Sequence, residues 1–394
     1  MVNVATGDDV YVRLREFLDR LPSGFPATES GVELRLLRKL FTPEEAELAM
    51  RLRLFPEPAR VIARRCGLGE SEAAEKLEDM ARKGLVLRVF GGRERFYLAL
   101  HFVVGIYEFH LNDIDRELAE MFEEYIEHAG RTLPKQYRVV PVGAAVPSAS
   151  RVAPYDRVRE LVSRYEDIAV APCICRREKG LLGEECDKPS ETCLTFGVGA
   201  QLYVENGLGR RIDAAEALAV LDRAEEAGLV LNATNARDIV NICCCCSCCC
   251  GVLRALKLEE RPAEGIRSPY YAEIDPASCD LCGTCLERCQ MEALRESDGS
   301  MRVDRDRCIG CGLCVSTCPA GAVRLVTKED VPAPYANYFH NLAGVAGGRG
   351  LPFGKMTPVM RLTKIPVFLR VLPYLYKTGL VTPVVNLLAR RGWV

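Results

Sequence analysis

The stretch CDLCGTCLERCQ, residues 279–290, is repeated in pattern by CIGCGLCVSTCP, residues 308–319. Both copies have the spacing C-x2-C-x2-C-x3-C, and together they supply eight cysteines: Cys279, Cys282, Cys285, Cys289, Cys308, Cys311, Cys314 and Cys318. Three thiolates at two-residue gaps can wrap one face of a cluster of four irons and four sulfides, and the fourth can reach a second cluster. Glycines at 283, 310 and 312 free the backbone near the metal. The pattern predicts two 4Fe–4S clusters; two zinc sites or a disulfide framework are the alternatives.

This repeat resembles the bacterial-type ferredoxin domain with two 4Fe–4S clusters, over roughly residues 269–327. The resemblance implies one cluster held by Cys279, Cys282, Cys285 and Cys318. It implies a second cluster held by Cys308, Cys311, Cys314 and Cys289. Gln290 departs from the family, which usually has proline after the fourth cysteine, and this departure affects the stiffness of the loop rather than the ligands.

The cysteine content sets the redox environment that we expect for the chain. The chain has 394 residues, enough for two or three domains, with 48% hydrophobic and 27% charged residues. It has 20 cysteines, and all but Cys66 lie between residues 173 and 318. The N-terminus lacks the basic start and apolar run of a secretory signal, so we expect metal-bound thiols in a reducing cytoplasm rather than disulfides. Oxygen-sensitive clusters would imply an anaerobic setting.

We expect an α+β protein with four parts. These are a helical domain at 1–135, a cysteine-rich α/β metal-binding domain at 136–265, the two-cluster domain at 266–328 and a basic apolar tail at 329–394. In the first part, Thr42 and Ser71 are predicted helix N-caps, and residues 85–90 and 93–100 read as a hairpin around a Gly91–Gly92 turn. Three helices followed by a two-stranded wing resemble the winged-helix domains of transcription regulators.

The charge of this first part argues against DNA binding. A recognition helix needs basic or amide side chains to reach phosphates and bases. The candidate helix, residues 70–83, instead sets five acidic side chains against three basic ones: Glu70, Glu72, Glu75, Glu78 and Asp79 against Lys76, Arg82 and Lys83. The wing does carry Arg88, Arg93 and Arg95. We therefore expect a docking or structural role for this part, with DNA binding as the weaker alternative.

The middle part holds two further groups of thiols. Cys173, Cys175, Cys186 and Cys193 lie within 21 residues and are predicted to form a metal site. Basic residues beside them, among them Arg176, favour thiolates by lowering the thiol pKa. A second run, ICCCCSCCCG, places seven cysteines in residues 243–250. Adjacent side chains diverge, so we expect only some of them to bind metal: Cys243, Cys246, Cys248 and Cys249. The site would hold a third iron–sulfur cluster or zinc.

The two cysteine-rich blocks also support a wider resemblance. Residues 165–325 look like a group of multi-cluster ferredoxin-like proteins of anaerobic bacteria and archaea, which share a PCxCR block, an ICxCCxCCCG block and a C-terminal ferredoxin module. Residues 249–251 spell the cysteine-cysteine-glycine motif of heterodisulfide-reductase-type subunits, but the downstream spacing does not match that family.

The tail differs in charge from the body. No Asp or Glu follows Asp330, whereas residues 331–394 carry eight Lys or Arg. Its apolar runs are too short to cross a bilayer, and three prolines interrupt them: Pro366, Pro373 and Pro383. We expect the tail to dock on protein, its own body or a partner subunit. The alternative is peripheral attachment to the cytoplasmic face of a membrane.

The chain shows no phosphate-binding glycine loop, no HExxH and no GxSxG motif. We therefore predict no catalytic residues and an iron–sulfur electron-transfer protein that works with redox partner proteins. It would be a carrier or an oxidoreductase subunit rather than a stand-alone enzyme. Two alternatives are an iron–sulfur redox sensor that binds DNA, and a redox enzyme subunit with catalysis at an unusual cluster in 243–250.

Overall fold

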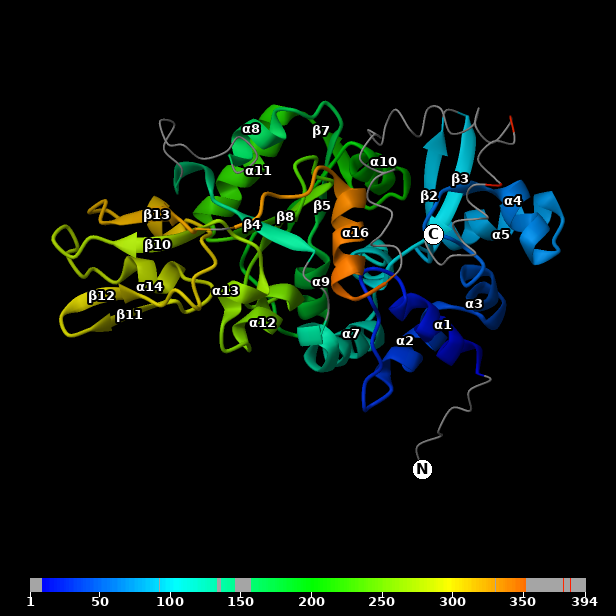
Figure 1. Ribbon diagram of the computed structural model, residues 1–394, viewed down its shortest axis with the longest axis horizontal. Coiled ribbons are helices and arrows are strands. Elements are labelled where there is room, and N and C mark those ends of the chain that lie inside the picture. Colours follow the sequence, from blue (N-terminus) through cyan, green and yellow to red (C-terminus); the bar gives the residue numbers. More distant parts are fainter. Residues whose placement is uncertain are drawn as a thin grey trace. The chain divides into compact units, whose positions relative to one another are not determined.

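The computed structural model describes residues 9–91, 93–132, 136–145, 157–329 and 331–351, together with Thr378 and Pro383. The chain divides into two compact units: unit 1 is Met1–Pro134 with Leu342–Val394, and unit 2 is Lys135–Asn341. Both units mix helices with strands, so the predicted α+β class is confirmed (Figure 1). The finer division into four parts stays a prediction.

Unit 1 is built of helices and one small sheet. Its elements are α1 (Val10–Asp19), α2 (Val32–Leu40), α3 (Pro43–Ala49), β1 (Glu57–Pro58), α4 (Ala59–Cys66), α5 (Glu70–Arg82), β2 (Val86–Gly91), β3 (Glu94–Ala99), α6 (Tyr107–Phe109) and α7 (Arg116–Ala129). The predicted hairpin is present as β2 and β3, and β1 adds to it in the order β1-β3-β2. Aromatic rings from three segments pack together in its core, with Phe25 and Phe102 centred 4.1 Å apart.

Capping residues explain where the helices of unit 1 begin. The Thr42 side chain accepts from the Glu45 amide while the Glu45 carboxylate accepts from the Thr42 amide, with Pro43 at the first position of α3. The predicted N-cap at Ser71 is wrong, because α5 begins at Glu70 with Gly69 as its N-cap. Glu70 and Glu72 then lie in the first turn, where the helix dipole favours negative charge.

The end of the described chain contributes to unit 1. Helix α16 (Tyr338–Gly348) leads to Arg349, whose guanidinium donates to the carbonyl oxygens of Asp19 and Leu21 at 2.8 and 2.7 Å. It also donates to the Asp19 carboxylate at 2.9 Å. Residues 342–351 are therefore tied to the turn that follows α1.

A six-stranded antiparallel sheet forms the larger part of unit 2. The strands lie in the order β4-β8-β9-β6-β5-β7: β4 (Tyr137–Val140), β8 (Val230–Thr234), β9 (Asn241–Cys245), β6 (Glu191–Phe196), β5 (Ile168–Pro172) and β7 (Arg210–Ile212). The helices around it are α8 (Val158–Val162), α9 (Ile174–Leu181), α10 (Val198–Glu205), α11 (Ala214–Glu226), α12 (Gly251–Lys257) and α13 (Pro262–Gly265). Strand β8 is buried along its whole length, so both faces of the sheet are covered there.

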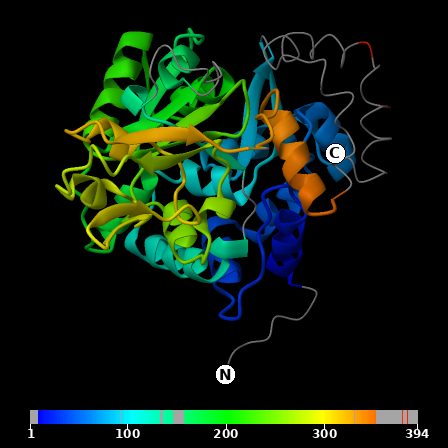
Figure 2. The same cartoon turned by 60° about the vertical axis from the view of Figure 1, so that its left-hand side comes forward.

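The remaining part of unit 2 carries the repeated cysteine motifs. It consists of two antiparallel ribbons, β10 (Tyr270–Ile274) with β13 (Val323–Thr327) and β11 (Leu294–Ser297) with β12 (Ser300–Val303), and of the short helices α14 (Thr284–Arg288) and α15 (Leu313–Ser316). Both ribbons lie at one end of unit 2 (Figure 1 and Figure 2). One hydrophobic core runs from the sheet into this part and includes Val139, Cys246, Cys308 and Leu313. The two cysteine-rich regions therefore pack as one body.

No helix in the described ranges is long and apolar enough to span a bilayer. Docking or membrane contact is predicted for residues 331–394, and of these, 352–394 lie outside the described residues apart from Thr378 and Pro383.

Candidate metal centres

The two cysteine motifs of unit 2 adopt matching backbone conformations. Leu281 and Gly283 in the first have φ of 58° and 77°, and Gly310 and Gly312 in the second have 65° and 81°. These are equivalent positions of the repeat, two residues after the first cysteine and one after the second. Each loop is therefore bent twice through the left-handed region, which glycine adopts most readily.

The eight thiols of these motifs separate into two sets. Burial raises the pKa of the Cys285 thiol, and the charges of Cys279, Cys282 and Cys318 raise it further. The other four cysteines, Cys289, Cys308, Cys311 and Cys314, line one cavity between the loops and the ribbons. This is the division that the ferredoxin resemblance implies, and the assignment of each thiol as an iron ligand stays a prediction.

Backbone amides donate to sulfur in the second set. The Ala272 amide lies 3.3 Å from the Cys308 Sγ atom, and the Ala293 amide lies 3.2 Å from the Cys289 Sγ atom. Amide donors stabilise thiolates and help to set the potential of an iron–sulfur centre. A cavity lined by four cysteines, with amides donating to their sulfurs, fits a 4Fe–4S cluster.

Two side chains join the first motif to the six-stranded part of unit 2. The Gln290 Oε1 atom accepts from the Ser247 amide at 2.8 Å, and its Nε2 atom donates to the Gly228 carbonyl at 3.0 Å. The Arg288 guanidinium donates to the carbonyls of Glu225 and Glu226, both at 2.6 Å. The residue that departs from the ferredoxin family therefore makes two hydrogen bonds that proline could not make.

The clearest cluster of thiols lies outside these motifs. We call Cys186, Cys246, Cys248 and Cys249 the tetrathiol group; their Sγ atoms all lie within 4.8 Å of one another. The Cys186 Sγ atom is 3.9 Å from that of Cys246 and 3.6 Å from that of Cys248, and the Cys248 and Cys249 Sγ atoms are 3.7 Å apart. Such a group can bind metal.

Arg176 places a positive charge beside these thiols. Its side chain is buried on helix α9, where it donates to the Thr192 hydroxyl at 2.6 Å and to the Cys244 carbonyl at 2.9 Å. Burial raises the pKa of Cys246, but the Arg176 charge and hydrogen bonds from Cys248 and Cys249 outweigh it, so the pKa lies below the usual thiol value. Cys246 is thus held toward the thiolate, the form that binds metals.

A second set of thiols, which we call the thiol chain, consists of Cys173, Cys175, Cys250 and Cys245. Cys173 is hydrogen-bonded to Cys175, Cys175 to Cys250, and Cys250 to Cys245. The hydrogen bond to Cys175, together with burial, raises the pKa of Cys173. Arg176 lies near this set too, since the charges of Cys173 and Cys245 act on it together with those of Cys186 and Cys246.

The structure groups the predicted metal ligands of residues 136–265 differently from the two sets of four cysteines that the sequence predicts. Cys186 joins Cys246, Cys248 and Cys249, whereas Cys173 and Cys175 belong to the thiol chain. Cys193 lies opposite Cys243 in the β6–β9 pair.

Two thiols of the thiol chain, Cys245 and Cys250, are absent from the predicted set. The alternation of side chains along β9 and the N-cap position of Cys250 on α12 decide their placement. Only their membership of the cysteine-dense run could have indicated them.

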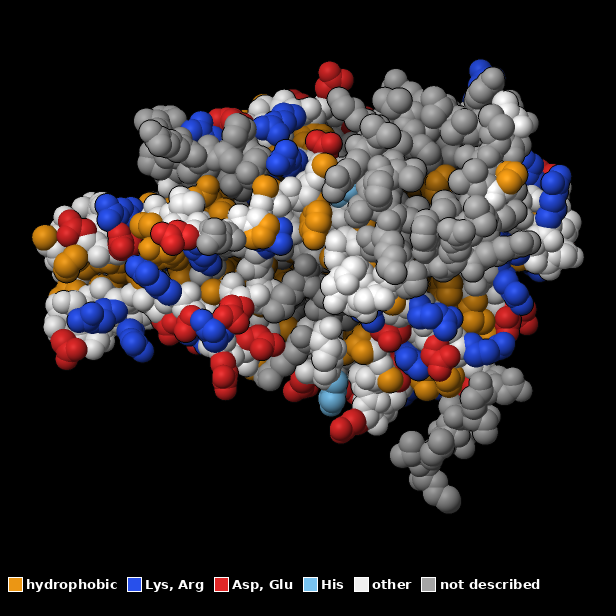
Figure 3. Space-filling model, in the orientation of Figure 1, with side chains coloured by type: hydrophobic (Ala, Val, Ile, Leu, Met, Phe, Trp, Pro, Cys, Tyr) orange, Lys and Arg blue, Asp and Glu red, His pale blue; other side chains and the backbone are white. Residues whose placement is uncertain are grey.

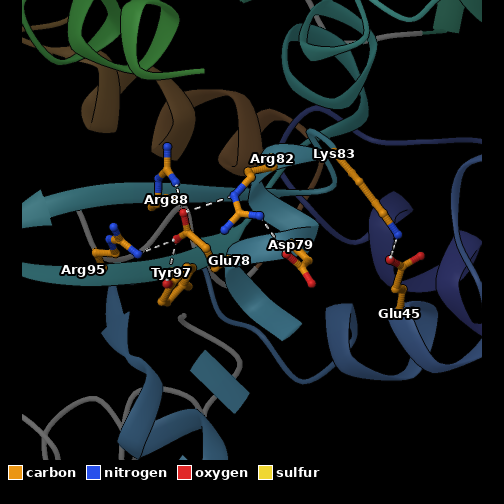
Figure 4. A network of polar contacts seen from close by, with 8 residues as sticks. All are labelled: Glu45, Glu78, Asp79, Arg82, Lys83, Arg88, Arg95 and Tyr97. Carbon is orange, nitrogen blue, oxygen red and sulfur yellow. Dashed lines mark hydrogen bonds and ion pairs between the residues drawn. The ribbon is translucent and has the colours of Figure 1, made fainter. Parts of the chain in front are cut away.

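In unit 1, the buried carboxylate of Glu78 on α5 pairs with two of the basic side chains of the hairpin, Arg88 and Arg95 (Figure 4). The contact with Arg95 is 3.2 Å long, and the carboxylate also accepts from the Tyr97 hydroxyl at 3.2 Å. Burial and then the Glu78 charge raise the pKa of Tyr97 to about 12. Lys83 pairs with Glu45 at 2.6 Å. These basic groups are occupied within unit 1.

Among known families, the model of the 4Fe-4S dicluster domain matches residues 272–325. The match covers both cysteine motifs, the β11–β12 ribbon and most of the β10–β13 ribbon. It supports iron–sulfur cluster binding in this segment of the chain. No curated protein matches the chain, and no solved structure matches it.

Proposed function

We propose that the protein is an iron–sulfur electron-transfer protein whose ferredoxin-type segment carries two 4Fe–4S clusters. The observation that carries the proposal is the pair of four-thiol sets within residues 272–325, which match the dicluster family. Cys279, Cys282, Cys285 and Cys318 would hold one cluster, and Cys308, Cys311, Cys314 and Cys289 the other. A 4Fe–4S cluster accepts and returns a single electron.

The protein's own residues would set the properties of these centres. The amides of Ala272 and Ala293 donate to Cys308 and Cys289 and favour the reduced, more negative state of that set. Burial of Cys314 among hydrophobic neighbours limits the access of water and opposes added charge. The balance of these effects would fix the potential.

We place the docking surface for a redox partner beside the first set. Cys282 is exposed, and the neighbouring Leu281, together with Leu286 on α14, is also exposed, at 36% and 37%. Figure 3 shows hydrophobic side chains between charged ones at this end of unit 2. A small apolar patch over a cluster ligand suits a transient partner, because electron-transfer interfaces are small.

The alternative of a DNA-binding regulator is less well supported. The resemblance of unit 1 to a winged helix rests on its helices and hairpin, but Arg88 and Arg95 are paired with Glu78 and Lys83 with Glu45. A phosphate backbone would have to compete with these carboxylates. We therefore propose that unit 1 has a docking or structural role.

The test is metal and sulfide analysis of anaerobically purified protein, with EPR of the dithionite-reduced form. We expect about four irons and four sulfides to be lost from each of two variants, Cys285→Ala and Cys314→Ala, because each removes a ligand of a different set. Cys66→Ala, which changes a cysteine of unit 1, is the matched control and should keep both clusters. Absence of acid-labile sulfide from the wild-type protein would overturn the proposal.

A further inference from the structure

We propose that the tetrathiol group binds a single metal ion in a tetrahedral tetrathiolate site, separate from the two ferredoxin-type clusters. The site goes beyond the proposed electron-transfer function and does not depend on it. Its ligands would be Cys186, Cys246, Cys248 and Cys249.

The spacing of the sulfurs indicates one ion. Four thiolates bound tetrahedrally at about 2.3 Å from one ion have their sulfurs about 3.8 Å apart. Three of the six Sγ–Sγ distances in the tetrathiol group are 3.6, 3.7 and 3.9 Å, and all six are within 4.8 Å. A cubane binds each thiolate to a different iron, and its ligand sulfurs are consequently farther apart.

The ferredoxin-type motifs provide a comparison within the same chain. All eight of their cysteines are described, yet across the described residues the tetrathiol group is the only set of three or more His, Cys, Asp or Glu ligand atoms that lie within 4.8 Å of one another. The thiols that match a cluster-binding family are thus more widely spaced than the tetrathiol group.

The fold brings these sulfurs together from two segments. Three of the ligands lie in the turn after β9, which is closed by a hydrogen bond of 3.0 Å from the Cys250 amide to the Cys246 carbonyl. Hydrogen bonding of the Ser247 amide to Gln290 fixes the same turn. Cys186 lies in the loop between α9 and β6, so an ion bound by all four thiolates would link that loop to the turn.

The charge around the group suits such an ion. Four thiolates and one divalent cation leave a charge of about −2, which needs compensation in a partly buried site. Arg176 is 7% exposed, and its buried Nε atom has no hydrogen-bond partner among the described atoms. Its charge acts on Cys246, and it interacts electrostatically with thiols of both the tetrathiol group and the thiol chain.

Zinc and iron both bind four thiolates in this geometry, and the experiment distinguishes them. The full chain is purified anaerobically and analysed by X-ray absorption at the zinc and iron edges. If the ion is zinc, we expect about one zinc per chain with four sulfur neighbours at about 2.3 Å. If it is iron, we expect iron in excess of sulfide by about one per chain.

Two variants assign the ion to this site. Cys186→Ala and Cys248→Ala should each lose about one ion per chain and leave sulfide and the EPR signals of the reduced clusters unchanged. Cys66→Ala is the control and should lose nothing. Loss of sulfide together with the metal in either variant would mean that a cluster occupies the site. A wild-type spectrum without a single-ion, four-sulfur zinc site and without excess iron would also overturn the proposal, whether or not the variants fold.

Discussion

At the scale of single residues, Gln290 stands where ferredoxins usually have proline, and its side chain makes two hydrogen bonds. The Gln290→Pro change restores the usual ferredoxin residue but removes the hydrogen bonds to Ser247 and Gly228. We expect it to destabilise the turn that carries the tetrathiol group by about 1–3 kcal/mol. Hydrogen–deuterium exchange should show faster exchange of the amides in residues 246–249. Glu287→Gln, a change at an exposed position nearby on α14, should leave the exchange rates unaltered. If the amides of residues 246–249 exchanged equally slowly in both variants, the hydrogen bonds of Gln290 would not stabilise this turn.

His101 should make the stability of unit 1 depend on pH. It is 5% exposed, and burial lowers its pKa to about 4 from an ordinary value of 6.5. At this side chain the unfolded chain therefore binds more protons between these values, and the contribution of His101 to stability falls as the pH drops from 6.5 toward 4. The loss amounts to about 3 kcal/mol over the full interval. Between pH 7 and pH 5, urea unfolding should show the wild-type protein losing about 2 kcal/mol more stability than His101→Gln. The comparison is made against the variant because Glu108, whose pKa is raised to about 8 by desolvation, acts in the opposite direction in both proteins. His128→Gln, at an exposed position, should behave like the wild type.

At the scale of elements, the two cysteine loops offer a matched pair of glycines. Gly283 and Gly312 occupy equivalent N-cap positions of α14 and α15, with φ of 77° and 81°. A Cβ atom at Gly312 would overlap the Ala145 side chain, whereas one at Gly283 would meet nothing within 4 Å.

We expect Gly283→Ala to cost only the left-handed conformation, about 1–2 kcal/mol. Gly312→Ala should also force apart the loop and the segment of Ala145. It should therefore lower the iron content and the thermal stability much further. Iron-to-protein ratios and thermal inactivation of the two variants measure the difference, and equal losses would show that crowding at Ala145 is unimportant.

Local signals explain which elements could be predicted. The capping box at Thr42, the hairpin around Gly91 and the spacing of Cys279–Cys318 depend on neighbours within a few residues, and the structure shows helix α3, the hairpin and the paired cysteine loops. The grouping of Cys186 with Cys246 depends instead on which strands pair. Nothing in the sequence reveals that β6 and β9 are neighbours, so the grouping with Cys193 followed sequence distance alone.

At the scale of the whole molecule, Arg349 links a segment late in the chain to the turn after the first helix, α1. Its three hydrogen bonds pair with the carbonyl oxygens of Asp19 and Leu21 and with the Asp19 carboxylate, in the turn after α1. Gly24 leaves room for the guanidinium, because a Cβ atom at Gly24 would lie only 3.0 Å from it. We expect Arg349→Ala to destabilise unit 1 by about 1–3 kcal/mol. Limited proteolysis should then cleave near residues 19–25 sooner than in the wild type. Arg20→Ala, a change at an exposed neighbour, should not accelerate this cleavage.

The contact between the two ends of unit 2 has a consequence for how the chain could have been assembled. The Asn341 side chain donates to the Gln136 carbonyl at 2.9 Å, so the first and last residues of unit 2 meet. A segment whose ends meet can be inserted into a host domain, or excised from it, without pulling the host apart. The cysteine-bearing unit thus has the topology of a guest placed between two parts of a host, and residues 136–341 form a natural fragment for separate expression.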